Sequence, residues 1–391
     1  MKKLLLLTLF FLAVSNSIQA QNSKKNEVVN DSIQVASQVK EEDSVEDEES
    51  KKKLKKVIIP TVTYNNSFGA ILGFMASGFY KLNDTDSISP ESSSALIGAY
   101  STNDTWYAVQ ANKFYFKEDR FRSKLVGGLG SVNFQTYLDW GDIIGSLPPS
   151  IIPIPPPGEG VFIDYNTQFQ FIYLDFLVRT YKRLYLGGNM VYSHALTEFD
   201  APGNPKEELD LFGFGFSSEY DTRDNQFMPL SGFNGKFNTM TFLESLGSSS
   251  NYTNLNLEYN KYFPQGERNT ILLRLYGQAA VGDVPFAGQN VVGRDDLRGY
   301  SNGKYRANQV YDIQSEYRHW FAKRWGYVAF GGVATAINDA SDLSFDNLLP
   351  AVGGGIRFLA IPSSKISVGM DVAVGKDDWG LYFRIGEAFT R

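Results

Sequence analysis

The chain of 391 residues contains no cysteine and only two histidines, His194 and His319. The absence of cysteine excludes disulfide bridges, a thiolate metal site and a lipid anchor on an N-terminal cysteine. The histidines are isolated, and no nucleophile, nucleotide-binding or metal-ligand spacing accompanies them. We therefore expect no enzyme activity, no cofactor and no metal site, and the net charge of −6 gives no indication of nucleic-acid binding.

Long apolar runs are scarce as well. The run 4–14 follows Lys2 and Lys3, and a polar stretch then leads to Ala20. This order is typical of a secretory signal peptide over residues 1–20, cleaved after Ala20. The run is far shorter than the roughly 20 residues that a spanning helix needs. No other segment exceeds it, so we expect no helical membrane span.

Residues 21–56 form a charged tail without aromatic residues. Seven acidic residues lie in 41–49, and five lysines lie in 51–56. Such a stretch cannot bury enough apolar surface to fold alone, so we interpret it as a disordered periplasmic linker. The alternative is a functional one, in which the lysines lie on anionic headgroups or the acidic block docks a partner.

From residue 57 to 391 the sequence alternates between apolar and polar residues. In one segment Leu255, Leu257 and Tyr259 alternate with Asn254 and Asn256. Period two predicts strands, and a strand of about 9–11 tilted residues crosses a bilayer with its polar face toward a wet lumen. The pattern predicts an all-β, antiparallel transmembrane β-barrel of about 16 strands. The expected strands are 57–65, 68–80, 92–102, 105–117, 120–137, 163–180, 183–197, 208–221, 231–243, 251–263, 269–282, 308–321, 325–337, 349–359, 364–375 and 378–389.

The connections between these strands alternate in length. The short ones include 181–182, 264–268, 322–324 and 360–363, whereas 81–91 is an exception on the short side. Outer-membrane barrels place short turns in the periplasm and long loops outside. The long series is 138–162, 198–207, 283–307 and 338–348. The first of these contains Pro148, Pro149, Pro153 and Pro155 to Pro157, which predict a stiff surface loop or a partner-binding segment.

Three segments stand out from this pattern. A strand rich in aromatic residues leads directly into a turn in which Asp221 and Asn225 can accept hydrogen bonds from nearby amides, and Arg223 can pair with Asp221 or Asp224. The second segment lies in the long connection 283–307, and the third closes the chain. The three segments consist of Tyr220, Asp221, Arg223, Asp224, Asn225, Pro229 and Gly232; of Leu297, Arg298, Gly299 and Tyr300; and of Phe383, Ile385, Gly386 and Phe389.

Together these segments resemble the BamA/TamA superfamily of outer-membrane barrels, also called the bacterial surface antigen family, over residues 57–391. The resemblance implies 16 strands and a loop after strand eleven that folds into the lumen. It implies that Arg298 is held there by a carboxylate, and Glu316 matches one such position. A second family carboxylate, in a Phe-x-Asp-x-Gly pattern, is missing at Phe330 to Val333. In such a lock Gly299 would permit close backbone approach.

The resemblance also implies how such a barrel works. In the family the seam between the first and last strands is weak and can open. Pro60 removes a ladder donor on the first strand and Gly386 offers no side chain to pack on the last, in line with a weak seam, although a simple bend is the alternative. Residues 21–56 are too few for the periplasmic domains that family members carry, so we expect a version without them.

We therefore expect a bacterial outer-membrane protein that assists insertion, assembly or translocation of outer-membrane components through this seam. Its expected partners are outer-membrane lipid and client outer-membrane proteins or an assembly complex. The alternatives are a structural or partner-binding subunit of a larger outer-membrane complex, and a passive pore.

Overall fold

The computed structural model describes residues 54–65, 69–138, 161–200, 203–293, 297–300 and 304–390. The expected signal peptide, the charged linker up to residue 53 and the proline-rich part of the loop after residue 138 lie outside these ranges. Within the described ranges, no helix is long and apolar enough to cross a membrane.

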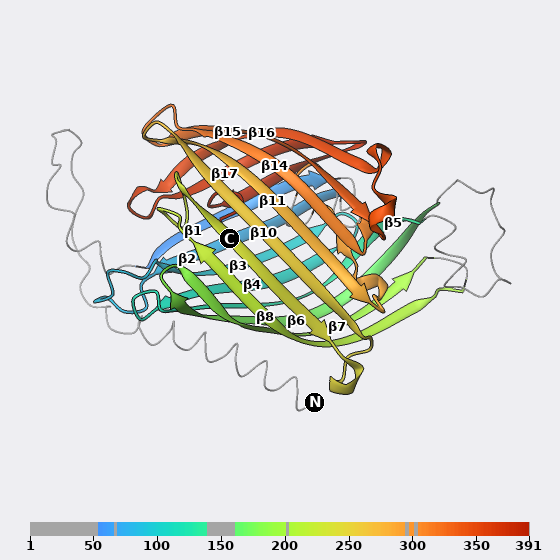
Figure 1. Ribbon diagram of the computed structural model, residues 1–391. Helices are drawn as coiled ribbons and strands as arrows, with labels where there is room; N and C mark the ends of the chain where they lie inside the picture. Colours follow the sequence, from blue (N-terminus) through green and yellow to red (C-terminus); the bar gives the residue numbers. More distant parts are fainter. Residues whose placement is uncertain are drawn as a thin grey trace, which may run out of the picture. The chain divides into compact units, whose positions relative to one another are not determined.

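Sixteen antiparallel strands form one closed barrel, in which consecutive barrel strands pair with each other and β18 closes onto β1 (Figure 1). The strands β12 (Asn290–Val291) and β13 (Arg306–Ala307) form a separate two-stranded sheet. The all-β class and the 16-strand barrel are thus confirmed. The barrel strands are β1 (Lys55–Asn65), β2 (Gly69–Tyr80), β3 (Ser92–Ser101), β4 (Trp106–Phe116), β5 (Phe121–Leu138), β6 (Val161–Tyr181), β7 (Leu184–Phe199), β8 (Lys206–Asp221), β9 (Gly232–Phe242), β10 (Tyr252–Gln265), β11 (Asn269–Gly282), β14 (Gln309–His319), β15 (Trp325–Ile337), β16 (Leu348–Ile361), β17 (Ile366–Gly375) and β18 (Asp378–Ile385).

The alternation in the sequence separates the two faces of the wall. Leu257 of β10, Ile313 of β14 and Val372 of β17 each leave about half of their side chain exposed on the outer face. The intervening Glu316 and Asp371 are buried inside the barrel. This pattern is the one that a lipid-facing exterior and a polar interior require.

The two ends of the barrel differ in their connections. We call the end that carries 182–183, 222–231, 266–268 and 362–365 the turn end, and the opposite end the loop end. The connection 81–91, which the sequence marked as long for this series, lies at the turn end. Figure 1 shows β5, β6 and β7 extending past their neighbours toward the loop end.

Asp86 organises the connection 81–91. Its carboxylate accepts hydrogen bonds from the Ser89 hydroxyl and amide at 2.6 and 2.8 Å, from the Ile88 amide at 3.0 Å and from the Glu118 amide at 2.9 Å. Burial raises the pKa of Asp86, but the hydrogen bonds from Ser89, Glu118 and Ile88 outweigh it and hold that pKa well below its usual range.

The chain leaves the barrel wall earlier than the alternation suggested. The strand expected at 378–389 ends at Ile385, and the next residue, Gly386, has a φ of +83°. Phe389, expected to be the last aromatic residue of that strand, has a φ of +60° and lines the lumen instead. The prediction was wrong here because the turn at Gly386 redirects the chain inward, and alternation carries no signal for such a turn.

Candidate functional site: the lumenal loop, the C-terminal tail and the seam

Arg298 lies in the connection between β11 and β14 and binds carboxylates of β14 and β17. Its Nη1 donates to Asp371 Oδ2 at 2.7 Å, and its Nη2 donates to Glu316 Oε2 at 2.5 Å. Its guanidinium carbon lies 3.3 Å from the centre of the Phe330 ring. Glu316 is thus brought together with Arg298, and the aromatic face of Phe330 adds a cation–π contact.

Asp371 is the functional residue that sequence reasoning missed. It lies on β17 and is fully buried, and it pairs with Arg298, Arg357 and Arg384. The family pattern placed a second carboxylate on β15, where this chain has none. Asp371 supplies the carboxylate from two strands further round the barrel, and the polar position between Met370 and Val372 is the only signal for it in the sequence.

The residues around Arg298 fix the loop against the wall. The Gly299 amide donates to the Tyr382 hydroxyl at 2.9 Å, and an added Cβ on Gly299 would meet backbone atoms of Val374 at 3.0 Å. The Tyr300 hydroxyl donates to the Pro350 carbonyl at 2.6 Å and accepts from the Lys376 amide at 3.0 Å. Leu297 and Tyr300 belong to one buried apolar cluster with Val310. Packing and hydrogen bonds therefore both hold this loop inside the barrel.

The turn after β8 is closed by its own side chains. The Asp221 carboxylate accepts from the Arg223 amide at 3.1 Å and from the Arg223 guanidinium at 2.9 Å. Asn225 Oδ1 accepts from the amides of Phe227 and Met228, and Asp224 Oδ1 accepts from those of Leu230 and Ser231. Burial lowers the pKa of Arg223, but Asp221 outweighs it and the net shift is upward. Arg223 therefore stays charged.

The remaining residues of this turn have different surroundings. Gly232 has a φ of +93°, and an added Cβ would lie 2.3 Å from the Thr222 carbonyl oxygen. Only glycine fits this position without strain. Pro229 is buried, whereas Tyr220 is partly exposed and stacks on Phe233 with 5.3 Å between ring centres.

The C-terminal tail, residues 386–390, folds back into the turn end of the lumen. Glu387 accepts from Arg357 Nε at 2.9 Å and from the Ser367 hydroxyl at 2.6 Å. Carbonyl oxygens of the tail are also bound. Ala388 accepts from Arg318 at 2.8 Å, Phe389 from the Tyr262 hydroxyl at 3.1 Å and Thr390 from Arg223 at 3.3 Å. The tail thereby joins the lumenal arginines to the turn after β8.

The seam between β1 and β18 is almost unpaired. One residue pair, Asn65 and Gly380, is registered between the two strands. By contrast, β1 pairs with β2 over all eleven of its residues, and β18 pairs with β17 over all eight of its own. Toward the turn end, Val57 of β1 and Ile385 of β18 share a buried apolar cluster. At the turn end, side-chain packing rather than a hydrogen-bond ladder therefore closes this seam.

Comparison with known proteins identifies the family of this barrel. The Omp85 superfamily domain matches residues 163–389, which is more than half of the chain. Curated proteins gave no match. Among solved structures, BamA from Haemophilus ducreyi lacking POTRA domains 1–3 is similar at a TM-score of 0.50 and 13% identity, over 85% of this chain and 70% of that one.

Two further structures have the same fold. CdiB from Acinetobacter baumannii matches at a TM-score of 0.53 and 11% identity, over 85% of this chain and 58% of its own length. CdiB from Escherichia coli matches at 0.51 and 11%, over 84% and 67%. This chain thus spans only part of the relatives that it resembles. It is a bacterial outer-membrane β-barrel, and it belongs to the Omp85 superfamily.

Proposed function

We propose that this barrel assists the insertion or translocation of outer-membrane components, with client outer-membrane proteins as its substrates, through lateral opening between β1 and β18. The observation that carries the proposal is the single registered pair, Asn65 with Gly380, at this one seam of the barrel. The other strand interfaces are paired over seven or more residue pairs each.

An unpaired strand edge can template another strand. The backbone groups of β1 and β18 that lack a partner across the seam are donors and acceptors for an incoming chain. In hydrocarbon, leaving such groups unsatisfied costs several kcal/mol each, so a client strand that pairs with them would be bound strongly. Pro60 of β1 removes one donor, which weakens resealing of the seam but leaves most of the edge free to pair.

The lumenal loop supplies the support that such an opening needs. Arg298 binds β14 through Glu316 and β17 through Asp371, so β17 is held from inside while its neighbour β18 parts from β1. A lateral opening can then occur at one place without loss of the remaining barrel.

A reversible cross-link tests the proposal directly. Because the chain has no cysteine, the variant Asn65→Cys/Gly380→Cys has one possible disulfide. Directly opposed residues of an antiparallel pair have Cα atoms about 4.5–5.5 Å apart, which suits a disulfide. In proteoliposomes, we expect insertion of a small client barrel, followed as protease resistance, to be lost on oxidation and restored by reduction.

Matched variants separate the seam from other effects. Val372→Cys/Leu381→Cys links β17 to β18 inside a complete ladder, and we expect insertion to continue when it is oxidised. Arg298→Ala should slow insertion with the seam free. Insertion that persists with the Asn65–Gly380 link oxidised would refute lateral opening, and wild type no faster than empty liposomes would point to a partner-dependent subunit instead.

A further inference from the structure

The barrel holds one cavity in its lumen and a second cavity at its turn end. The lumenal cavity has a volume of about 740 Å³ and extends from the inner loop to the C-terminal tail. The turn-end cavity has a volume of about 520 Å³ and is lined by the turn after β8 and by residues 363–365. Among the residues that the structure describes, Arg122 alone lines both cavities. Its side chain therefore lies on the boundary between them.

Arg122 is held tightly at this boundary. Its Nε and Nη2 donate to the two oxygens of Asp119 at 2.9 and 2.8 Å, and its Nη1 donates to Asp221 at 3.0 Å. Nη1 also lies 3.1 Å from Glu219, and the guanidinium stacks 3.8 Å from the centre of the Tyr185 ring. With 7% exposure, the side chain is fixed by contacts from β7, from β8 and from the turn before β5. We call Arg122 and these carboxylates the Arg122 clamp.

The lining of both cavities is basic although the whole chain has a net charge of −6. Each cavity is lined by seven arginines and lysines against four carboxylates. A cleft lined mainly by one sign of charge concentrates ions of the other sign. Both cavities should therefore favour anions over cations.

Several of these cations lack a carboxylate partner. In the described part of the chain, Lys113 on the lumenal wall makes no ion pair, and neither do Arg179, Lys182, Arg183 and Lys365 around the turn-end cavity. Lys113 also lies directly opposite Lys124 in the β4–β5 ladder. Like charges placed opposite each other destabilise a sheet, and a bound anion would relieve this cost.

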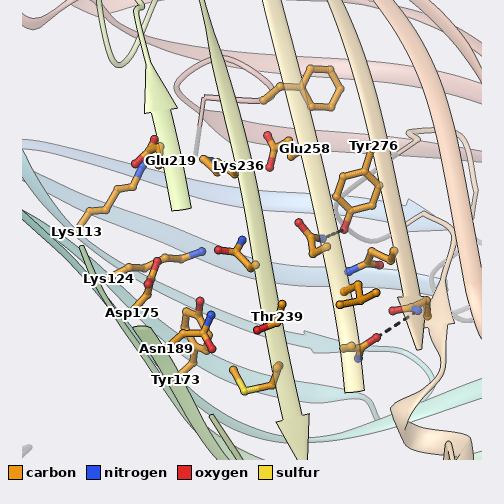
Figure 2. A pocket seen from close by; sticks show the side chains of 18 of the residues that line it. Lys113, Lys124, Tyr173, Asp175, Asn189, Glu219, Lys236, Thr239, Glu258 and Tyr276 are labelled. Carbon is orange, nitrogen blue, oxygen red and sulfur yellow. Dashed lines mark hydrogen bonds and ion pairs between the residues drawn. The ribbon is translucent and has the colours of Figure 1, made fainter. Parts of the chain in front are cut away.

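Figure 2 shows how these charges are arranged around the lumenal cavity. The side chains of Lys113 and Lys124 extend from neighbouring strands on one side, and Lys236 and Glu258 lie on the strands across from them. Lys236 and Glu258 approach within 3.8 Å, so this carboxylate is already paired, whereas Lys113 points toward Glu219 without forming an ion pair.

From these observations we infer that the two cavities form a path for small anions, with the Arg122 clamp as its constriction. Removing the Arg122 side chain would join the cavities without touching the seam or Arg298. This anion path does not depend on client insertion, because conductance and insertion are measured in separate assays.

Conductance in planar bilayers tests both parts of this inference. Compared with wild type, Arg122→Ala should raise single-channel conductance several-fold. In a KCl gradient the reversal potential of the wild-type barrel should show a preference for chloride over potassium of roughly 10-fold. Arg120→Ala is the matched control, because Arg120 is exposed two residues away and packs on Phe121. Arg122→Lys should give an intermediate conductance because it keeps one charge but loses the bidentate pair.

Each outcome is decisive. Conductance of Arg122→Ala equal to that of wild type would show that the clamp is not the constriction, and a preference for potassium would overturn the anion path. If Arg122→Ala does not fold, Asn238→Cys in the otherwise wild-type barrel places one thiol on the lumenal cavity. An anionic thiosulfonate reagent should then modify it roughly 10-fold faster than a cationic one, relative to a cysteine on the outer surface. Equal relative rates would refute the basic path.

Discussion

Neutralising Asp371 should destabilise the barrel more than removing Arg298, although the two residues bind each other. Asp371 is fully buried and faces the guanidinium groups of Arg298, Arg357 and Arg384. In Asp371→Asn these three cations would remain buried with one carboxylate fewer. Breaking a buried ion pair in this way costs about 3–5 kcal/mol, because it leaves a buried charge that is not compensated.

Arg298→Ala leaves no carboxylate without a cation. Glu316 keeps Arg318 Nε at 2.7 Å, and Asp371 keeps Arg357 and Arg384. The loss comprises two charge-assisted hydrogen bonds and the contact with Phe330, partly offset by the remaining cations. We expect a cost of about 2 kcal/mol in the free energy of unfolding.

Urea unfolding in lipid vesicles, followed by the gel mobility of the folded barrel, measures both costs. Asp210→Asn is the matched control, since Asp210 is a partly exposed carboxylate that contacts His194 Nδ1 at 3.2 Å, and its effect should stay within about 0.5 kcal/mol. The reasoning would be refuted if Arg298→Ala cost more than Asp371→Asn, or if Asp371→Asn were as stable as wild type.

Three further variants probe the turn end. Gly232→Ala should lower the free energy of unfolding by at least about 1 kcal/mol more than Gly247→Ala does, and comparison of the urea midpoints of the two variants checks this. Both residues have a φ of +93°, but only at Gly232 would an added Cβ meet backbone atoms. Glu387→Gln should release the tail from Arg357, so that carboxypeptidase trims it faster than in wild type, and an unchanged rate would contradict the role of this pair. The carboxylate of Asp86 has its pKa depressed by hydrogen bonds. Its contribution is therefore fully present above the unfolded pKa of about 4 and is lost progressively as pH falls from there through the lower folded pKa. Proteolysis of 81–91 should therefore rise in acid in wild type, and Asp86→Asn should be cleaved readily already at neutral pH.

The strands could be predicted from sequence because a transmembrane wall imposes a simple rule. Leu257 faces lipid and Glu258 faces the lumen, and this alternation persists along each strand whatever its partner. Most strand ends therefore fell within a few residues of those observed. The wall ends early at Ile385 because a single glycine turn intervenes, and the residues after it still read as an alternating segment.

The contacts of Arg298 could be predicted only in part. Glu316 lies on the next long strand after Arg298 and matches a family position. Asp371 lies 73 residues after Arg298, on a strand that does not pair with β14. Which lumenal carboxylate meets which arginine depends on the diameter and closure of the barrel. Local sequence carries neither quantity, so the Arg122 clamp and the tail contacts were also absent from the prediction.

The strongest and weakest parts of this barrel lie next to each other, and that arrangement limits where it can open. Arg357 and Glu387 tie β16 to the tail, and Arg298 ties β14 to β17 through Asp371. These buried ion pairs connect the strands that precede β18. Separating any of those strands would therefore leave a buried charge without its partner in the lumen. Between β1 and β18 no such pair crosses in the described residues, and one registered pair, Asn65 with Gly380, holds the ladder. Opening at β1–β18 therefore breaks few hydrogen bonds and leaves no buried charge unpaired. Opening at any interface from β14 to β17 would break a full hydrogen-bond ladder and would also break buried ion pairs.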